Sequence, residues 1–349
     1  MRAAPSFSSR VVRWQRDHGR SDLPWQRTRD AYRVWLSEIM LQQTQVSTVI
    51  PYYERFLARF PDVASLAAAS VDDVLALWSG LGYYARARNL HRAAQMVVEK
   101  FAGEFPRTFE EVALLPGVGR STAAAIAAFS SGEARAILDG NVKRVIARHA
   151  GIGGDPSSAA VLGRLWQEAE ARMPAADIEA YTQGMMDLGA DICSPRRPAC
   201  LVCPVAGDCV ARIESRVEEL PGRRARKVSP RRQVGMLVVL SHDEVLLEKR
   251  PMTGIWGGLW SLPEFALEGE ACATLQRDWG LSARAATRLP GFEHAFTHFT
   301  LEVTPWRIEL AGNRETAFER RATWLALQEV DGAALPSPIR KLLRSISAA

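Results

Sequence analysis

The sequence predicts a protein of several domains, in which an all-α region precedes a smaller α+β domain. Apolar residues recur at helical spacing in segments such as YRVWLSEIMLQ and STAAAIAAF, between about residues 10 and 212. Farther along, VGMLVVL and EVLLEKR flank the turn residues SHD, and FTLEVTPWRIEL alternates as a strand does. Helical patterns at about 268–279 and 337–346 complete an α+β domain. A chain of 349 residues is long enough for two or three domains.

Residues 216–232 predict a linker between a helical region of residues 1–215 and a domain of residues 233–349. The stretch concentrates Arg, Pro and Lys and has almost no apolar periodicity. Its positive charge would let it lie along a phosphate backbone. The whole chain carries a net charge of +5, which suits a polyanionic partner without identifying one.

The composition excludes several classes of protein. With 47% hydrophobic and 24% charged residues the chain is neither disordered nor fibrous. The start, MRAAPSFSSR, has no apolar core of signal-peptide length, and no run approaches the ~18 apolar residues of a membrane span. We therefore expect an intracellular protein.

Residues 114–122, LLPGVGRST, predict a tight turn between two helices. Pro116 ends the first helix, and Gly117 and Gly119 permit the backbone to turn and to approach another group closely. The second helix then presents free N–H groups and the positive end of its dipole, which bind a phosphate without reading a base. A plain connection between two helices is the alternative, and the turn alone does not decide between them.

Four of the five cysteines lie on one short loop, as Cys193, Cys200, Cys203 and Cys209. In an intracellular chain the spacing C-x6-C-x2-C-x5-C favours a metal or cluster site over a disulfide framework. Zinc and an iron-sulfur cluster both take four thiolates, and the single CxxC pair favours the cluster. Cys272 stands alone in a helical stretch, where we expect a small buried residue.

The hairpin, the aspartate of LDGNVKRVIARH and the cysteine loop together resemble the helix-hairpin-helix DNA glycosylases that carry an iron-sulfur cluster. VWLSEIMLQQTQV and LGYYARARNL are similar, almost residue for residue, to the MutY-type adenine glycosylases, and the resemblance extends from about residue 10 to the end. It implies two helical subdomains, one with a 4Fe-4S cluster on residues 193–209, and a Nudix-like domain after them. It also implies a monomeric enzyme of base excision repair in the cytoplasm, on the nucleoid in a bacterium. Its substrate would be double-stranded DNA with adenine opposite 8-oxoguanine or guanine.

Ser121 separates two branches of these glycosylases. In the endonuclease III branch a lysine follows the hairpin and attacks the sugar, which adds lyase activity. Serine cannot form a Schiff base, so the resemblance implies a monofunctional enzyme in which Ser121 lines the pocket. Three alternatives stay open: a glycosylase and AP lyase for oxidised pyrimidines, a catalytically silent DNA-binding protein, and a Nudix hydrolase with a helical appendage.

Glu38 and Asp139 are the candidate catalytic residues. Glu38 stands among apolar residues at helical spacing, where partial burial would raise the pKa of its carboxyl as a general acid requires; a surface glutamate is the alternative. Asp139 alone indicates a turn or a helix N-cap. The resemblance implies that Glu38 protonates the adenine and assists a water, and that Asp139 stabilises the oxocarbenium-like state. It also implies that Asn141 helps to position this site.

The resemblance implies a set of DNA contacts as well, because the adenine must be flipped out of the duplex and the remaining stack must be held. Core packing is the alternative for the tyrosine of this set, and a solvated face is the alternative for its arginines. The expected contacts are Gln42, Tyr83, Gly117, Gly119, Arg86 and Arg88.

The second domain resembles a Nudix domain that has lost its catalytic carboxylates. After Gly257 and Gly258 the chain reads LWSLPEFALEGEACATLQRDWG, without the clustered glutamates that hold magnesium in Nudix hydrolases. The family inspects 8-oxoguanine with a loop that often reads Phe-Ser-His. Here the loop is Phe296-Thr297-His298, in which the threonine keeps the hydroxyl; a plain hairpin turn is the alternative.

Overall fold

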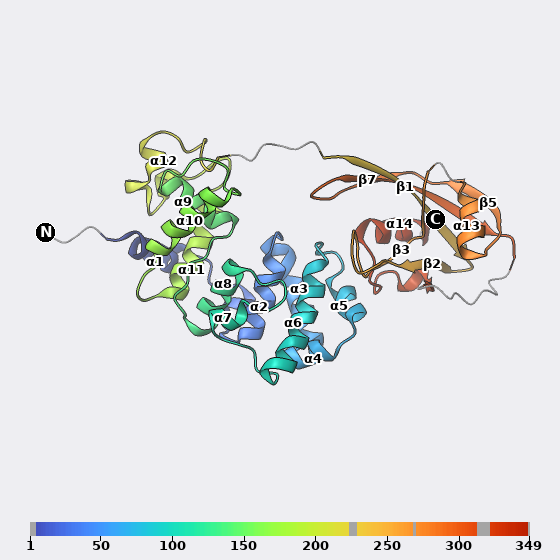
Figure 1. The fold of residues 1–349 in the computed structure, drawn as a ribbon, viewed down its shortest axis with the longest axis horizontal. Coiled ribbons are helices and arrows are strands. Elements are labelled where there is room, and N and C mark those ends of the chain that lie inside the picture. The colour runs from blue at the N-terminus through green and yellow to red at the C-terminus, as the bar shows by residue number, and fades with distance from the viewer. Residues whose placement is uncertain (1–4, 223–228, 268–269, 313–321, 348–349) are drawn as a thin grey trace. The chain divides into compact units, whose positions relative to one another are not determined.

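The chain folds into two compact units (Figure 1). The computed structural model describes residues 5–222, 229–267, 270–312 and 322–347. The first unit comprises Met1–Ala68 and Asn89–Arg226, and the second comprises Ala69–Arg88 and Lys227–Ala349. Within the described residues, strands occur only in the second unit. No helix in this part of the chain is long and apolar enough to cross a membrane.

Helices of the first unit begin where the sequence supplies a side chain that accepts a hydrogen bond from a free backbone N–H. Ser6, Asp30, Thr108, Asp139 and Ser158 each cap a helix in this way. The helical elements are α1 (Phe7–His18), η1 (Pro24–Arg27), α2 (Ala31–Leu41), α3 (Val46–Arg59), α4 (Val63–Ala68), α7 (Phe109–Val112), α8 (Arg120–Ser131), α9 (Gly140–His149), α10 (Ala159–Ala171), α11 (Ile178–Asp187), η2 (Leu188–Ile192), η3 (Cys200–Val202), η4 (Ala206–Asp208) and α12 (Val210–Ile213). Helix α6 (Ala85–Phe101) begins in the second unit and ends in the first.

Helix α8 is the central helix of the first unit. Residues 123–128 are all buried, and all of them except Ile126 are alanines. Such small side chains allow neighbouring helices to approach closely, and both α2 and α11 pack against α8. The same core includes Val145 and Ile146 of α9. Close packing on α8 therefore brings together helices that are far apart in the sequence.

The second unit is built around a mixed sheet. Its main path runs β3-β2-β1-β7-β5. Off this path, β4 pairs with β1, β6 with β7 and β8 with β2. Strands β1 and β7 are parallel, from the pair Arg231 and Thr300 to the pair Leu240 and Glu309. The strands are β1 (Arg231–Ser241), β2 (Glu244–Lys249), β3 (Trp260–Ser261), β4 (Glu264–Phe265), β5 (Ala283–Arg288), β6 (Phe292–Ala295), β7 (Thr300–Leu310) and β8 (Ala322–Ala326). Helices α5 (Val71–Trp78), α13 (Ala271–Trp279) and α14 (Ser337–Ser347) and the turn η5 (Leu327–Glu329) complete the unit, with α13 packed over β1 and β5.

The structure modifies the expectations for Cys272 and for the linker. Cys272 is exposed, so the expectation of a buried residue was wrong: α13 buries positions 271, 274 and 275, and position 272 projects from another face. The first residues of the predicted linker are ordered on the helical unit, where the Arg216 amide donates to the Ala211 carbonyl at 2.7 Å. The last linker residues, 231–232, already belong to β1, and residues 223–228 lie outside the described part of the chain.

The glycine turn joins α7 to α8. Helix α7 ends at Val112, before the predicted end at Pro116, and further turns lead to Gly119, which is the N-cap of α8. Gly117 has φ +81°, in the left-handed region. A Cβ atom there would lie 2.8 Å from the Cβ of Asn89. Gly117 is therefore required by both backbone conformation and packing.

We expect Gly117→Ala to lower the free energy of unfolding by about 1–2 kcal/mol, the cost of a left-handed conformation for a residue with a Cβ, and by more where Asn89 must move. Chemical denaturation measures the change. Gly119→Ala is the matched control, because Gly119 has a φ of −92° and no heavy atom lies within 4 Å of its added Cβ. Equal stabilities of the two variants would contradict the assignment.

Candidate active site

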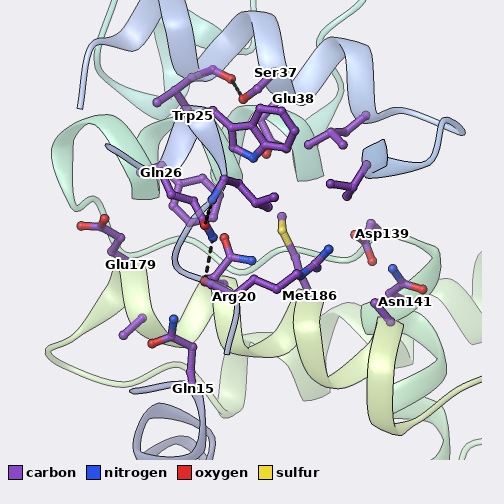
Figure 2. Close-up of a pocket in the computed structure, with 18 of the residues that line it drawn as sticks. Gln15, Arg20, Trp25, Gln26, Ser37, Glu38, Asp139, Asn141, Glu179 and Met186 are labelled. Carbon is purple, nitrogen blue, oxygen red and sulfur yellow. Dashed lines mark hydrogen bonds between the residues drawn. The ribbon is translucent and has the colours of Figure 1, made fainter. Parts of the chain in front are cut away.

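A cavity of about 1290 Å³ in the first unit collects the predicted site residues. It is lined by parts of α1, η1, α2, α8, α9 and α11. Glu38 enters it from α2, and Asp139 and Asn141 reach it from the start of α9 (Figure 2). Gln42 and Ser121 also line it. The structure thus brings the two predicted catalytic carboxyl groups to one cavity.

Glu38 carries a carboxyl group that holds its proton unusually well. Burial raises its pKa from 4.5 to about 8, and the nearby negative charge of Asp139 contributes to the rise. Both Val34 and Leu41, one turn away on the same helix, line the cavity beside it. A carboxyl group with this pKa is protonated at neutral pH and can act as a general acid.

Asp139 is the N-cap of α9, where the chain enters the helix. Its Oδ1 accepts a hydrogen bond from the Val142 amide at 2.8 Å. Burial raises the pKa of this carboxyl, while the backbone hydrogen bonds from Val142 and Asn141 oppose the rise because they stabilise the ionised form. Arg144 and Lys143 oppose it further by their positive charge. Asp139 therefore has partners that stabilise a carboxylate, and among the described residues Glu38 has none.

Ser121 and Gln42 have structural contacts as well as positions on the cavity wall. The Ser121 hydroxyl accepts a hydrogen bond from the Leu138 amide at 2.9 Å, next to Asp139 in the sequence. The Gln42 amide nitrogen lies 3.3 Å from the hydroxyl of Thr122. Both bonds involve the start of α8, so the helix that follows the glycine turn also anchors the loop of Asp139.

Asn141 connects the cavity to the cysteine loop through Arg144. The Asn141 side-chain oxygen accepts from Arg144 Nη2 at 2.8 Å, and Arg144 Nε donates to the Cys193 carbonyl at 2.6 Å. A Cβ on Gly189 would lie 2.6 Å from that of Asn141, so η2 packs directly on the start of α9. The position of Asn141 thus depends on the segment that leads into the cysteine loop.

The four predicted metal ligands face one small cavity beside α9. Cys193, Cys200, Cys203 and Cys209 line a space of about 30 Å³ and are all partly buried. Burial raises the pKa of the Cys203 thiol to about 11, and the nearness of the other three sulfurs contributes. Arg148 is 3% exposed, and its Nη1 donates to Cys193 Sγ at 3.3 Å. Within the described residues, no group of three or more His, Cys, Asp or Glu side chains is arranged to hold a metal ion.

Several cavity residues were not predicted from the sequence. They include Arg20, which precedes η1, and Gln183 and Met186 of α11, which share the cavity with Glu38. Gln183 and the buried Asp187 stand four residues apart and are hydrogen-bonded. That helical spacing was visible in the sequence, but nothing there connects α11 with Arg20.

Three predicted DNA contacts belong to the second unit. Tyr83 is 48% exposed and has φ +49°, so its ring is available on a tight turn. Arg86 donates to the carbonyls of Leu81 and Gly82 and its guanidinium lies over the Tyr83 ring. Burial lowers the pKa of Arg86 to about 10. Arg86 thus supports the turn that carries Tyr83, and its contact with DNA stays a prediction.

Arg88, also of the second unit, is hydrogen-bonded within the protein. Its Nη1 donates to the carbonyl of Gly257 at 2.6 Å. Burial lowers the pKa of its guanidinium. This arginine does not have the fully solvated face that was the alternative, and its predicted contact with DNA also stays a prediction.

The loop Phe296-Thr297-His298 connects β6 to β7 as a tight turn. The Phe296 amide donates to the Phe299 carbonyl at 2.8 Å, and the rings of these two residues are stacked with centroids 4.8 Å apart. Trp256 and His294 contact the Phe296 ring from other directions. Thr297 and His298 are exposed. The phenylalanine is thus held in an aromatic cluster, which leaves the two polar side chains open to a ligand.

Two family models match the chain, one in each part. Residues 36–171 match the HhH-GPD superfamily of base excision DNA repair proteins, and residues 235–345 match the NUDIX domain. An adenine DNA glycosylase of Buchnera aphidicola is 38% identical over 97% of both chains. The human adenine DNA glycosylase is 34% identical, over 97% of this chain and 73% of the human one. The chain belongs to the adenine DNA glycosylase family.

Solved structures support the same fold for the helical part of this family member. A thermostable thymine-DNA glycosylase is 29% identical, with a TM-score of 0.55, over 60% of this chain and 95% of its own. Endonuclease III in a DNA complex, at 20% identity and a TM-score of 0.51, shows the shared fold. The predicted architecture, a helix-hairpin-helix glycosylase region followed by a Nudix-like domain, is confirmed.

We expect the Asp139→Asn substitution to lower the pKa of Glu38 from about 8 while leaving it well above 4.5, because burial is the larger cause and the charge of Asp139 the smaller. Carbon-13 NMR of the side-chain carboxyl groups measures the pKa of Glu38 in the free protein. Asp177→Asn is the control, since Asp177 lines the same cavity and pairs with Arg16. An unchanged Glu38 pKa in Asp139→Asn would exclude coupling of the two carboxyl groups.

Proposed function

We propose that the protein is a monofunctional DNA glycosylase of base excision repair that hydrolyses the bond between adenine and deoxyribose. The observation that carries this proposal is the pairing, in one cavity, of Glu38, whose pKa burial raises to about 8, with Asp139, whose carboxylate accepts a hydrogen bond from the start of α9. Membership in the adenine DNA glycosylase family supports it.

In the proposed reaction, Glu38 donates its proton to a ring nitrogen of the flipped adenine, so that the base leaves as a neutral molecule. The C1′–N9 bond breaks and leaves an oxocarbenium-like sugar. Asp139, whose ionised form is favoured by the start of α9, stabilises that positive charge. Glu38, now ionised, accepts a proton from the water that attacks C1′, which restores the starting state.

The cavity has room for an extruded nucleotide. Its volume of about 1290 Å³ exceeds the usual range of small-molecule pockets, about 300–1,000 Å³. Stacked bases in a duplex hide the reacting atoms, so the adenine must leave the stack to reach Glu38. We assign Tyr83 and Gln42 to holding the duplex while the base is out, and the N–H groups at the start of α8, with Gly117 and Gly119, to a backbone phosphate.

We further propose that the four cysteines hold one 4Fe-4S cluster. The support is the donor set: four thiols around one space, with Arg148 beside one of them to offset the negative charge of thiolates. The cluster would fix the loop of residues 193–209, and through Arg144 the position of Asn141. Iron and acid-labile sulfide in the purified protein test this assignment; zinc in their place would overturn it.

We assign recognition of the base opposite the adenine to the second unit. The exposed Thr297 and His298 offer hydrogen-bonding groups that suit the extra N7–H and O8 of 8-oxoguanine. The substrate we propose is therefore double-stranded DNA with adenine opposite 8-oxoguanine or guanine. We expect a monomer that acts on chromosomal DNA in the cytoplasm.

We expect the wild-type protein to release adenine from a labelled duplex with one adenine opposite 8-oxoguanine, and the strand to break only after alkali, because Ser121 provides no amine for a Schiff base. Glu38→Gln should slow base release by at least about 100-fold, the usual contribution of a general acid, and retain binding of the duplex. Strand cleavage without alkali would indicate a lyase, and binding without base release by the wild type would indicate a silent DNA-binding protein.

In the loop Phe296-Thr297-His298, we expect His298→Ala to lower the preference for 8-oxoguanine over guanine opposite the adenine. The expected loss is about two- to tenfold, the equivalent of one hydrogen bond. Single-turnover rates on the two duplexes measure the ratio. His242→Ala is the control, because His242 is exposed on the turn between β1 and β2. If His298→Ala leaves the ratio unchanged, recognition lies elsewhere.

A further inference from the structure

The cavity wall contains a buried carboxylate that the proposed reaction does not use. Asp187, the last residue of α11, is 0% exposed. Its Oδ2 accepts from the Arg20 amide at 3.0 Å, and its Oδ1 accepts from Arg20 Nε at 2.7 Å and from Gln183 Nε2 at 2.8 Å. Both oxygens therefore face donors.

Both donor residues line the cavity that holds Glu38. Arg20 in turn fixes Gln26, another lining residue, because its carbonyl accepts from Gln26 Nε2 at 2.9 Å (Figure 2). The Gln26 oxygen accepts from the Leu23 amide at 3.1 Å. One buried carboxylate thus holds Gln183 and Arg20 directly, and Gln26 through the Arg20 backbone, on the wall formed by α11, η1 and the segment before η1.

Asp187 also decides which end of the Gln183 amide is available to a ligand. An ionised carboxylate only accepts hydrogen bonds, so Gln183 must turn its NH2 group toward Asp187. Its oxygen, an acceptor, is then the free end of this cavity-lining side chain. Adenine carries an exocyclic amino group, which donates, whereas guanine carries a carbonyl at the same ring position and unsubstituted purine carries only hydrogen.

We propose that Asp187 is a positioning residue for base selection, which orients Gln183 and Arg20 so that this wall offers an acceptor to a purine with an exocyclic amino group. The inference rests on the proposed glycosylase function and adds a residue that touches neither the base nor the sugar. A wall that is built to accept a hydrogen bond rejects bases without the matching donor, because its polar atom would then remain unpaired.

The test is Asp187→Asn, which keeps the shape of the side chain but cannot keep all of its hydrogen bonds to Arg20 and Gln183. Because both carboxylate oxygens accept, the carboxamide NH2 must face a donor in either orientation. We expect single-turnover release of adenine to slow by about tenfold or more, while release of unsubstituted purine from the same duplex position slows much less. The adenine to purine rate ratio should therefore fall, and affinity for the duplex should change little.

The matched control is Asp62→Asn. Asp62 lies in the same unit, accepts from the Ser65 amide at 2.8 Å, and is not part of the cavity. This variant should keep the wild-type ratio. Gln183→Leu should lower the ratio by itself, and adding Asp187→Asn to it should lower the ratio little further, because both changes remove the same oriented acceptor.

Each outcome decides the matter. Equal slowing of adenine and purine release in Asp187→Asn, or a lowered thermal midpoint with an unchanged ratio, makes Asp187 purely structural and overturns the proposal. If Asp187→Asn does not fold, an unchanged ratio in Gln183→Leu overturns it. A wild-type protein that releases no base overturns the glycosylase function and this inference with it. Wild-type activity with an unchanged ratio in both variants overturns only the inference.

Discussion

Glu38 and Asp139 share a cavity in which charge is poorly solvated, so ionisation of one carboxyl group opposes ionisation of the other. Burial is the larger cause of the raised Glu38 pKa, and Asp139 adds to it. The two groups differ in their hydrogen bonds. Amide groups at the start of α9 stabilise the ionised form of Asp139, while Glu38 lies beside the apolar Val34 and Leu41 of its own helix. In the proposed reaction, this difference in environment, more than the distance between the groups, makes Glu38 the acid and Asp139 the stabiliser.

This difference in environment depends on ordinary helix chemistry. The carboxylate of Asp139 is held because it caps α9, and an N-cap interaction contributes about 1 kcal/mol to stability as well as fixing the side chain. Ser121 holds Leu138, the residue before Asp139, by a hydrogen bond. Helix α8, on which Ser121 lies, can approach α2 closely because five of its six buried residues at 123–128 are alanines. The glycine turn, helix α8 and the N-cap of α9 therefore together support the two proposed catalytic residues.

The sequence predicted the local parts of this arrangement and missed those that depend on distant contacts. Asp139 as a helix cap and Glu38 on an amphipathic helix follow from short patterns, and the resemblance placed both in one site. The length of α7 was overestimated because LLPG continues the apolar pattern although its backbone already turns. Cys272 was misplaced because the phase of α13 relative to the sheet is a tertiary property. The bond between Arg20 and Asp187 spans 167 residues, and no local pattern indicates such a pair.

Stability alone does not explain a carboxylate at position 187. Buried ion pairs are often matched or exceeded in stability by apolar residues of similar volume, because desolvation costs as much as the pairing returns. An apolar side chain there would still pack between α11 and the segment before η1, but it would leave the Gln183 amide free to rotate and Arg20 without its acceptor. An amide has nearly the same shape in its two orientations and opposite hydrogen-bonding character. In the proposed base selection, a fixed charge behind the amide keeps it in one orientation, and Asp187 is the residue in that position.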